Sequence, residues 1–517
     1  MRKALLIGSV ILGLGSPALA QHEHGAAAPV QGKVGNVNLK NDGNAAAQVP
    51  FQRGLALLHN FEYSSAAEAF RAAQAADPGF ALAYWGEAMT YNHPLWAEQD
   101  SAAARAVLAR LAPTPEARRS KARSEREAQW LAAVEALYGS GTKIERDFAY
   151  ADRMKAIFAA DPNDVDARAF RALSIMGLAH SGRDIALYMQ AASLLEEAFP
   201  ANPNHPGVVH YLIHTYDDPA HAPLGERAAR RYALVAPDAG HAQHMVSHIY
   251  LALGRWAEVE HANRQAMTVV NAQRAANGKA PSSCGHYNEW LAYALDQQGK
   301  DSNDLVDACE KQAMADAESL NDPSILGGLR NLVTNWSQIA VRHGVDTGRW
   351  PTAALPPGEK LALARFNLAY GDLLANRKSA SGAAAALQAM KAQRAIIGSV
   401  IAKEWPDDDE SLPWFDRAVA QGEAVVALAV GKREEGIRLL RNAAAAEAEL
   451  PVPFGPPVLA KPSAELLGEE LLASGQMADA ADAFERALAA APNRRLAVQG
   501  LAAASSNRAL ASKDGTH

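Results

Sequence analysis

Two short stretches of the chain carry histidine pairs at helical spacing. VVHYLIHTYD contains His210 and His214, and HAQHMVSHIY contains His244 and His248, so each pair is four residues apart. Side chains four residues apart lie on the same face of a helix, one turn from each other. The second pair follows the first by 34 residues. Because imidazole nitrogens bind Zn, Cu, Ni and Fe, the duplicated pair predicts a transition-metal site.

A further histidine extends the second pair. His241 precedes His244 by three residues, and steps of three and four keep side chains on one helical stripe. Seven of the 16 histidines fall between residues 205 and 248, so imidazoles are concentrated in this part of the chain. If the two helices pack roughly 8 to 10 Å apart, four imidazole nitrogens can converge between them. The alternative is duplication of an ancestral repeat in which the histidines served packing alone.

Residue types exclude several other chemistries. The residues inside the two pairs are YLI and MVS, so neither pair carries the glutamate of the HExxH metalloprotease motif. The sequence has no phosphate loop, dinucleotide fingerprint or GxSxG elbow. The two cysteines, Cys284 and Cys309, lie outside the histidine stripe, which excludes a thiolate site. Nitrogen donors do not suit Ca or Mg, and among Zn, Cu, Ni and Fe the export signal described below makes copper or zinc the expected cofactor.

The elements that must position these histidines are helices. Apolar residues make up 49% of the 517-residue chain but aromatic residues only 7%, and runs such as SGAAAALQAMKAQRA are strong helix formers. The chain is too long for one ordinary hydrophobic core, which favours a repeat architecture. Its formal net charge is −7, with Lys and Arg scattered along the chain rather than gathered into a basic stripe. Nucleic acid is therefore not an expected partner.

Two segments near opposite ends of the chain share a pattern of small, aromatic and proline positions. Each carries glycine, alanine, phenylalanine, alanine and proline at relative offsets 0, 12, 16, 19 and 24: Gly54, Ala66, Phe70, Ala73 and Pro78 in the first, and Gly468, Ala480, Phe484, Ala487 and Pro492 in the second. On these residues the chain resembles the tetratricopeptide repeat family. In such a repeat, small residues let two antiparallel helices approach, the aromatic ring fills the gap, and proline ends the second helix.

The resemblance implies an all-α, tetratricopeptide-type solenoid. We expect about nine to eleven antiparallel helix pairs in a right-handed superhelix with a concave inner face. The solenoid is predicted over residues 47–502, with histidine-rich repeats at 206–239 and 240–273. Residues 21–46 are predicted to be a flexible segment in which GNVNLKND packs on the first repeat, and residues 503–517 a flexible tail. Loops at 274–284 and 451–460 are expected to roof a small site.

The resemblance also implies which side chains face the groove. In this family, positions 2, 5, 9, 12 and 13 of the first helix of a repeat line the concave face. If Pro237 lies near the end of one repeat, that repeat begins at residue 206 and the next at residue 240. The paired histidines then fall at positions 5 and 9 of their repeats, and His241 falls at position 2. The next repeat begins near residue 285, which puts His286 at position 2, Glu289 at position 5 and Tyr293 at position 9. His286 therefore joins the candidate metal ligands.

Other polar residues are secondary candidates. Glu289, Asp217 and Asp218 are expected to orient imidazoles from the outer shell or to add a fourth ligand, and Glu289 and Asp218 are the candidate catalytic bases. His221 lies in the turn between two helices.

Histidines elsewhere in the chain have simpler interpretations. His59 and His93, also 34 residues apart, fall at groove position 13, but neighbouring Asn60 and Pro94 favour helix-end roles instead. The histidines that read as turn or surface residues are His180, His205, His261 and His343.

The N-terminal residues have the pattern of a secretory signal peptide. Arg2 and Lys3 precede the apolar run ALLIGSVILGLG, and SPALA ends at Ala20 with an AxA-type cleavage site. Residues 1–20 are therefore predicted to be removed, leaving a periplasmic or secreted chain with no membrane span. In an oxidising compartment Cys284 and Cys309 can form a disulfide; two buried free thiols are the alternative.

Three functions are compatible with this pattern. The first is an exported metalloprotein that binds Cu or Zn on its concave face, with catalysis left open. The second is a non-catalytic scaffold whose groove binds a peptide or a cell-envelope protein. The third is metal storage or delivery. Loops that roof the groove favour a small-molecule substrate over a long ligand.

Overall fold

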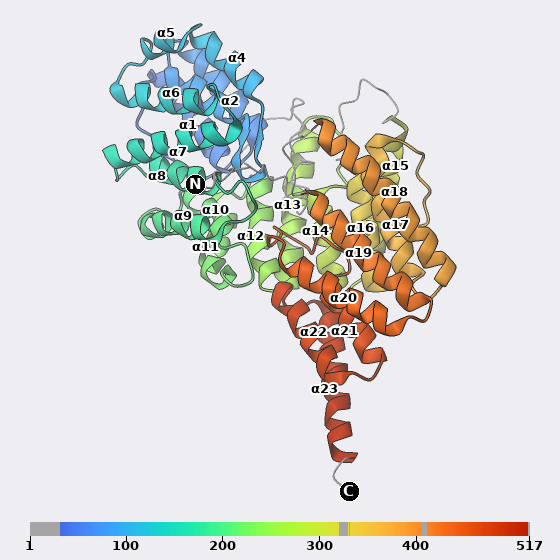
Figure 1. Ribbon diagram of the computed structural model, residues 1–517. Helices are drawn as coiled ribbons and strands as arrows, with labels where there is room; N and C mark the ends of the chain where they lie inside the picture. Colours follow the sequence, from blue (N-terminus) through green and yellow to red (C-terminus); the bar gives the residue numbers. More distant parts are fainter. Residues whose placement is uncertain (1–31, 320–328, 330, 405–410, 515–517) are drawn as a thin grey trace, which may run out of the picture.

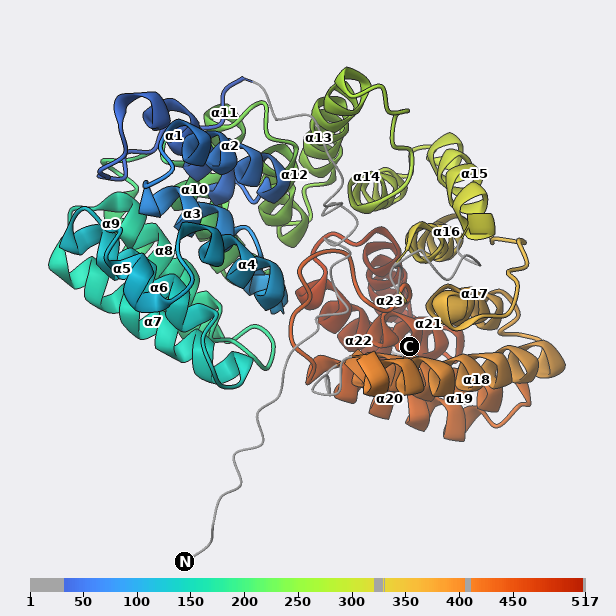
Figure 2. The same cartoon turned by 90° about the horizontal axis from the view of Figure 1, so that it is seen from above.

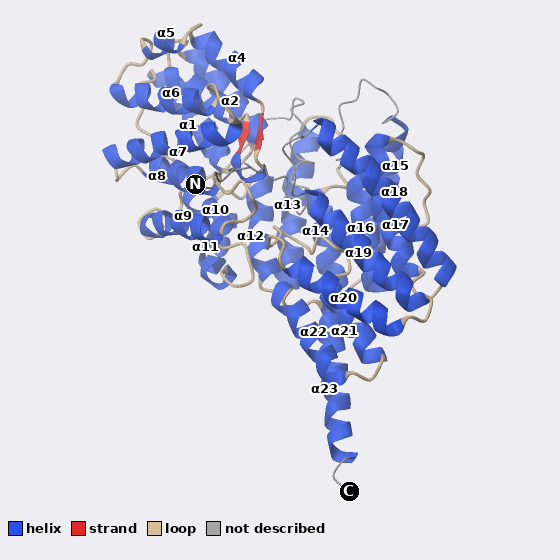
Figure 3. Cartoon of the chain, in the orientation of Figure 1, coloured by secondary structure: helices blue, strands red, loops and turns tan. Residues whose placement is uncertain are grey.

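The protein is built almost entirely of helices. A computed structural model describes residues 32–319, 329, 331–404 and 411–514 (Figure 1). Among these residues the strands are β1 (Asn92–His93) and β2 (Glu98–Gln99), which pair antiparallel (Figure 3). The expected all-α class is confirmed. The predicted signal peptide and its cleavage site lie outside the described residues.

Ten antiparallel helix pairs follow one another along the described chain. The pairs are α1 (Ala45–His59) with α2 (Tyr63–Ala76), α3 (Ala81–Met89) with α4 (Ser101–Leu111), α6 (Glu125–Leu137) with α7 (Lys143–Ala160), α8 (Val165–Met176) with α9 (Ile185–Ala198), α10 (Pro206–Thr215) with α11 (Ala222–Val235), α12 (Gly240–Ala252) with α13 (Trp256–Ala276), α14 (His286–Gln297) with α15 (Asn303–Ser319), α17 (Ala362–Ala375) with α18 (Ala380–Glu404), α19 (Ser411–Ala429) with α20 (Arg433–Ala448), and α21 (Ser463–Ala473) with α22 (Met477–Ala490). The remaining helical segments are α5 (Pro115–Arg119), α16 (Leu332–Thr347), α23 (Arg495–Asp514) and the 3-10 turns η2 (Pro94–Trp96) and η3 (Glu359–Leu361).

The pairs stack as the repeats of a solenoid do. The first helix of one pair packs on the first helix of the next, as α8 does on α10 and α10 on α12. This stacking and the number of pairs confirm the tetratricopeptide-type solenoid expected from the sequence. Helix α10 begins at Pro206 and α12 at Gly240, the residues predicted to open the two histidine-rich repeats.

Phenylalanine and glycine make the close helix contacts that the repeat pattern predicts. Phe70 is fully buried, and a Cβ built on Gly54 or Gly86 would lie only 2.9 or 2.3 Å from its ring. At the other end of the chain a Cβ on Gly468 would lie 2.8 Å from the ring of Phe484. Any larger side chain at these glycines would push the helices apart.

The solenoid folds back on itself at its N-terminal end. Helix α1 packs on α10, although the two are separated by three intervening helix pairs (Figure 2). The segment before α1 crosses the same region: Val34 and Leu39 are buried, and the side-chain amide of Asn60 donates to the carbonyl of Val34 over 2.8 Å. The end of α1 therefore lies against the histidine-rich repeats.

The C-terminal end also returns to the middle of the chain. The turn between α22 and α23 contacts α13 and α14, where the indole of Trp256 donates to the carbonyl of Asn493 over 2.9 Å. Next to it, the buried guanidinium of Arg494 donates to the hydroxyl of Tyr293 over 3.1 Å. The first residue of α23, Arg495, donates its backbone N–H to Gln297 of α14 over 2.9 Å, and the rest of α23 runs away from the central repeats (Figure 1). Both ends thus close on the central repeats.

The proline-rich segment 451–460 covers part of the interior. Arg342 donates to the carbonyl of Pro457 over 2.9 Å, and the guanidinium of Arg183 lies 5.2 Å from the ring centre of Phe454. Gly455 has a φ of 137° and approaches Trp290 so closely that a Cβ there would lie 2.8 Å from the indole. Glycine is required at this position, because it alone combines the backbone conformation with the close approach.

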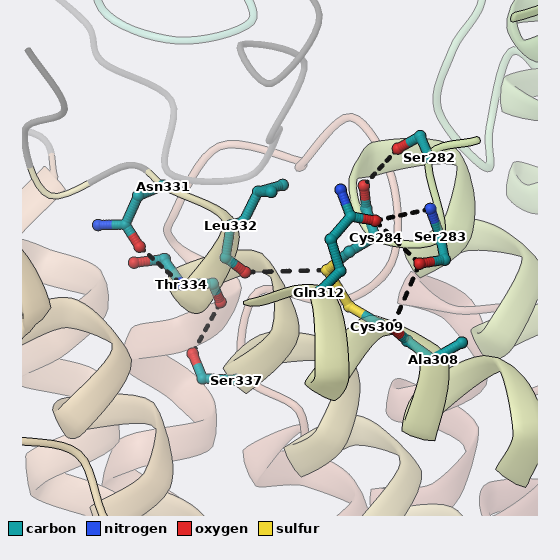
Figure 4. The surroundings of a disulfide bond; sticks show 10 residues. All are labelled: Ser282, Ser283, Cys284, Ala308, Cys309, Gln312, Asn331, Leu332, Thr334 and Ser337. Carbon is teal, nitrogen blue, oxygen red and sulfur yellow. Dashed lines mark hydrogen bonds between the residues drawn. A yellow bond between two sulfur atoms is a disulfide. The ribbon is translucent and has the colours of Figure 1, made fainter. Parts of the chain in front are cut away.

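The two cysteines are joined. Cys284, just before α14, and Cys309, in α15, form a disulfide (Figure 4). Beside it, the hydroxyl and backbone N–H of Ser283 bond to Gln312. This result selects the disulfide over the free thiols. None of the helices in the described part of the chain is long and apolar enough to cross a membrane.

Candidate functional site

Three neighbouring helices bring six histidines together. Helix α10 carries His210 and His214, and α14 begins with His286. Helix α12, between them, carries His241, His244 and His248. The start of α10 is fixed locally, because Pro206 occupies its first turn and the Nδ1 atom of His205 accepts from the backbone of Val208. Helix α10 packs on α12, so their histidine stripes face the same space.

The first triad comprises His210, His214 and His241. The Nε2 atom of His210 lies 3.1 Å from that of His214 and 3.2 Å from that of His241. The Nδ1 atom of His210 donates to the backbone carbonyl of His59 over 2.6 Å, so its Nε2 atom carries a lone pair. The lone pair of His210 can accept a hydrogen bond from one N–H group, but two imidazoles, those of His214 and His241, converge on it.

The second triad comprises His244, His248 and His286. The Nε2 atom of His244 lies 3.0 Å from that of His248 and 2.9 Å from that of His286. Its Nδ1 atom faces the side-chain oxygen of Asn263 at 2.7 Å, and the amide nitrogen of Asn263 donates to the carbonyl of Val259. This second bond fixes the amide orientation, so the Nδ1 atom of His244 must be the donor.

The hydrogen bonds of the second triad leave two lone pairs facing each other. The Nδ1 atom of His248 donates to the carboxylate of Asp217 over 2.6 Å. The N–H groups of both His244 and His248 therefore donate to acceptors outside the triad. Their Nε2 atoms, which carry lone pairs, lie 3.0 Å apart. Two lone pairs at that distance repel each other unless a cation lies between them.

Burial favours the neutral form of five of the six imidazoles. It lowers the pKa of His210 and of His286 to about 3, against an unperturbed value of 6.5. Burial and the neighbouring imidazoles hold the pKa values of His214, His241 and His244 well below the usual histidine range. A proton is thus a poor cation at these five imidazoles, and neutral imidazole is the form that binds metal.

The two triads adjoin each other. The ring centres of His214 and His248 are 6.1 Å apart, and those of His241 and His244 are 6.4 Å apart. The sequence predicted that the two HxxxH pairs would meet across one four-nitrogen site. The structure instead keeps each pair together and completes it with a third histidine: His241 for the first pair and His286 for the second.

The predicted outer carboxylates contact the site from different directions. Asp217 bonds directly to His248. Asp218 pairs with Arg183 at 3.0 Å, and Arg183 also donates to the backbone carbonyl of His214. Glu289, one of the two candidate bases, forms a buried ion pair with Arg342. Asp218 and Glu289 thus each neutralise an arginine beside the triads.

Aromatic rings surround the triads. The Phe61 ring centre is 4.4 Å from that of His210, and Trp290 lies 4.4 Å from His248 and 4.7 Å from His244. Phe61 has a φ of 57°, a backbone conformation rare for a non-glycine residue and common at functional sites. The sequence analysis missed Phe61, because nothing in the local pattern signals a positive φ.

A small, mostly apolar cavity borders Phe61. It has a volume of about 20 Å³, and its lining includes Phe61, Leu58, Phe170 and Tyr211. A space of roughly 10 to 15 Å³ admits one water-sized molecule, so this cavity can hold a small neutral molecule. Tyr211 and Phe61, which line the cavity, also contact the ring of His210.

A third histidine cluster lies nearby but is organised differently. The Nε2 atoms of His59 and His205 each lie 3.0 Å from the same carboxylate oxygen of Asp166, and all three side chains are buried. Burial alone raises the pKa of Asp166, but the two imidazoles outweigh it and hold that pKa well below the usual range. Burial lowers the pKa of His59 to about 4. Here the protein supplies its own anion between two imidazoles.

The interpretation of His343 as a turn or surface residue is wrong, because it lies inside α16, and His205, which closes the turn before α10, is buried rather than on the surface. His205 is 6% exposed because it caps α10 and bonds to Asp166, and His343 is 2% exposed because it bonds to Asp296. Neither carboxylate partner is adjacent to its histidine in the sequence, so the local pattern could not reveal these contacts. His180 bonds to the carboxylate of Asp147 over 2.9 Å.

The remaining candidates lie outside the triads. His93 stacks on Tyr63 with ring centres 4.1 Å apart and bonds to the carbonyl of Thr90. Tyr293 accepts from Arg494, and His221 bonds to Asp218 over 2.8 Å. These residues contribute packing and ion-pair contacts.

Comparison with known proteins adds no functional information. No model of a protein family matches the chain, and a search of curated proteins finds no match. Among solved structures, the chain is similar to the APC/C hetero-tetramer Cut9–Hcn1, with 12% identity over 90% of this chain and 78% of that one and a TM-score of 0.37. It is also similar to the human IFIT1 dimer with m7Gppp-AAAA, with 14% identity, coverage of 87% and 91%, and a TM-score of 0.31. The TPR domain of P58(IPK) shows 11% identity, coverage of 91% and 100%, and a TM-score of 0.19. Scores this low support no inference about the site.

Proposed function

We propose that this protein is an exported metalloprotein whose two histidine triads form a dinuclear transition-metal centre, with Cu or Zn as the metal. One ion would bind the first triad and one the second. The observation that carries the proposal is the convergence of Nε2 atoms at 2.9 to 3.2 Å within each triad. Bare lone pairs at this separation are unfavourable without a cation, and a metal ion satisfies all three at once.

The outer contacts of the triads suit metal binding. Metal-bound histidines normally donate their second ring N–H to a carboxylate, a carbonyl or a comparable acceptor, which fixes the ring orientation. His210 donates to a backbone carbonyl, His244 to an amide oxygen and His248 to a carboxylate. These three acceptors cover half of the six rings.

The donor set leaves room for chemistry. Three protein ligands on each ion leave at least one coordination position open, as in catalytic rather than structural sites. Because the triads adjoin each other, one small molecule could contact both ions. We therefore propose a small-molecule substrate and include catalysis in the proposal.

The scaffold alternative is less well supported. It requires the histidines to face a bound peptide, yet His210, His244 and His286 are at most 4% exposed. Segment 451–460 also packs against Trp290, and Trp290 in turn packs against His248 of the second triad. Metal storage or delivery requires ready exchange, which a buried site with fixed outer contacts does not favour.

Export belongs to the proposal as well. The signal-like residues 1–20 are its basis in the sequence. The disulfide between Cys284 and Cys309 supports it, since disulfides persist in oxidising compartments.

Elemental analysis of the protein, purified without a histidine tag, tests the proposal. We expect two equivalents of metal per chain in the wild type and one in His244→Ala/His248→Ala. The matched control is His180→Gln/His343→Gln, which removes two imidazoles outside the triads and should keep both ions. Wild-type protein that contains no Cu or Zn, and takes up neither on dialysis, would overturn the proposal.

A further inference from the structure

The charges around the triads discriminate between possible metals. Asp217, bonded to His248, is the side-chain carboxylate that touches a triad imidazole among the described residues. Arg183 and Arg342 also lie beside the triads, but each is already paired with a carboxylate, Asp218 and Glu289. The surroundings therefore add about one negative charge to the six imidazole ligands.

Glu62 is a second carboxyl group near the first triad. It accepts from the backbone N–H of His241 over 3.1 Å and does not contact the imidazole itself. Even if Glu62 is ionised, the site offers two negative charges at most. A pair of divalent ions would bring four positive charges into this buried space, whereas a pair of monovalent ions would bring two. The cost of burying an ion rises steeply with its charge, so the monovalent pair fits better.

From this balance we infer that the two triads hold a pair of cuprous ions, Cu(I), which together bind a neutral diatomic molecule of the dioxygen class. This inference rests on the proposed dinuclear centre. Cu(I) is the monovalent transition-metal ion that binds imidazole, and three nitrogen ligands leave it a free position for a further ligand. A neutral ligand adds no charge to the buried site.

The walls of the site also suit a neutral ligand. Phe61 and Trp290 pack against the two triads and provide mostly apolar ring surface, with the indole N–H of Trp290 as the one polar group of the two rings. The cavity of about 20 Å³ that Phe61 lines accommodates one molecule of diatomic size. A larger substrate would not fit in it.

Anaerobic titration with Cu(I), in the presence of a coloured Cu(I) chelator and ascorbate, tests the inference. We expect two Cu(I) ions per chain, retained against a hundredfold excess of Zn²⁺. Carbon monoxide, a non-reacting diatomic probe, should then give an infrared C–O band that is lost in a variant lacking both pairs, His210→Ala/His214→Ala/His244→Ala/His248→Ala. The His180→Gln/His343→Gln protein should keep the band.

Asp217→Asn provides a second, independent readout. The Coulomb energy between Asp217 and a metal ion doubles when the ion's charge doubles. If this substitution weakens Cu(I) binding tenfold through lost charge, Zn²⁺ binding should weaken about a hundredfold. Equal weakening of both metals would contradict the charge argument.

The outcomes separate this inference from the proposed function. Displacement of Cu(I) by Zn²⁺, or the absence of a carbon monoxide band in the Cu(I) protein, would overturn the cuprous pair while the metal centre stands. Failure to bind Cu(I), Cu(II) or Zn²⁺ at all would overturn both.

Discussion

The two triads and the His59–Asp166–His205 cluster contain the same side chain in opposite arrangements. In the cluster, one carboxylate oxygen of Asp166 lies between two imidazole nitrogens at 3.0 Å from each. In the triads, imidazole nitrogens face one another directly at 2.9 to 3.2 Å. The cluster is complete with the protein's own atoms, whereas the facing nitrogens of the triads call for a cation. Proximity of histidines therefore does not identify a metal site; the direction of their lone pairs does.

The largest expected contrast comes from removing imidazoles from each type of site. His210→Ala/His214→Ala should abolish binding of one metal ion and leave the second triad occupied, because only one set of three nitrogens is lost. His205→Gln should change the metal content little, since Asp166 already satisfies the imidazoles of the cluster. Metal analysis after gel filtration measures both. Loss of an ion from His205→Gln would show that the cluster, like the triads, contributes to metal binding.

Two buried carboxylates give a matched comparison. Asp166→Ala leaves two buried imidazoles without their shared partner and should lower the free energy of unfolding by roughly 3 to 5 kcal/mol. Asp217→Ala removes an outer contact of a metal ligand and should weaken metal binding by about 10- to 100-fold. Urea denaturation and chelator competition measure the two effects. The Asp166→Ala protein should still bind two ions. Loss of metal binding from Asp166→Ala, together with loss of stability alone from Asp217→Ala, would contradict this expectation.

The disulfide should affect the triads unequally. Cys284 lies two residues before His286, whereas no residue of the first triad adjoins either cysteine. Cys284→Ser/Cys309→Ser should cost roughly 2 to 4 kcal/mol of stability, as expected for a loop of this length. During stepwise dialysis against a weak chelator, this variant should release the ion of the second triad first. Simultaneous release of both ions would show that the disulfide does not support α14.

The smallest effect concerns pH. Burial lowers the pKa of His59 to about 4 and the pKa values of His210 and His286 to about 3. Below pH 6.5 the unfolded chain takes up protons that the folded chain does not, so the metal-free protein should lose stability as the pH falls toward 4. Each such histidine adds at most about 1.4 kcal/mol per pH unit to this slope.

Replacing histidines of the triads and, separately, a histidine of the Asp166 cluster tests how much each contributes to this dependence of stability on pH. Urea denaturation of metal-free protein at pH 5.0, 5.5 and 6.0 should show a shallower slope for His210→Gln/His286→Gln than for the wild type. His59→Gln should reduce it by about half as much. An unchanged slope in both variants would mean that these imidazoles are not buried in the neutral form.

Local sequence patterns predicted much of the site. The HxxxH spacing and the 34-residue interval placed His210 and His214 in register with His244 and His248, and the helices carry them as expected. Repeat register also placed His286 on the next helix, and α14 begins with it. Helical periodicity and repeat length are short-range properties, and these predictions needed nothing else.

Contacts between distant segments could not be predicted. The carbonyl that orients His210 belongs to His59, 151 residues earlier, and becomes available only because α1 returns to α10. Asp166 joins His59 and His205 across separations of 107 and 39 residues. The division into two triads depends on how α10, α12 and α14 cross, which side-chain packing along the whole solenoid determines.

Anomalous diffraction from metal-loaded crystals tests the central claim most directly. Data collected above and below the absorption edge of the bound metal should show two peaks: one within about 2.0 to 2.1 Å of the Nε2 atoms of the first triad and one at the same distance from those of the second. The cluster around Asp166 should show none. A single peak beside Asp166, or no peak at either triad, would contradict the account.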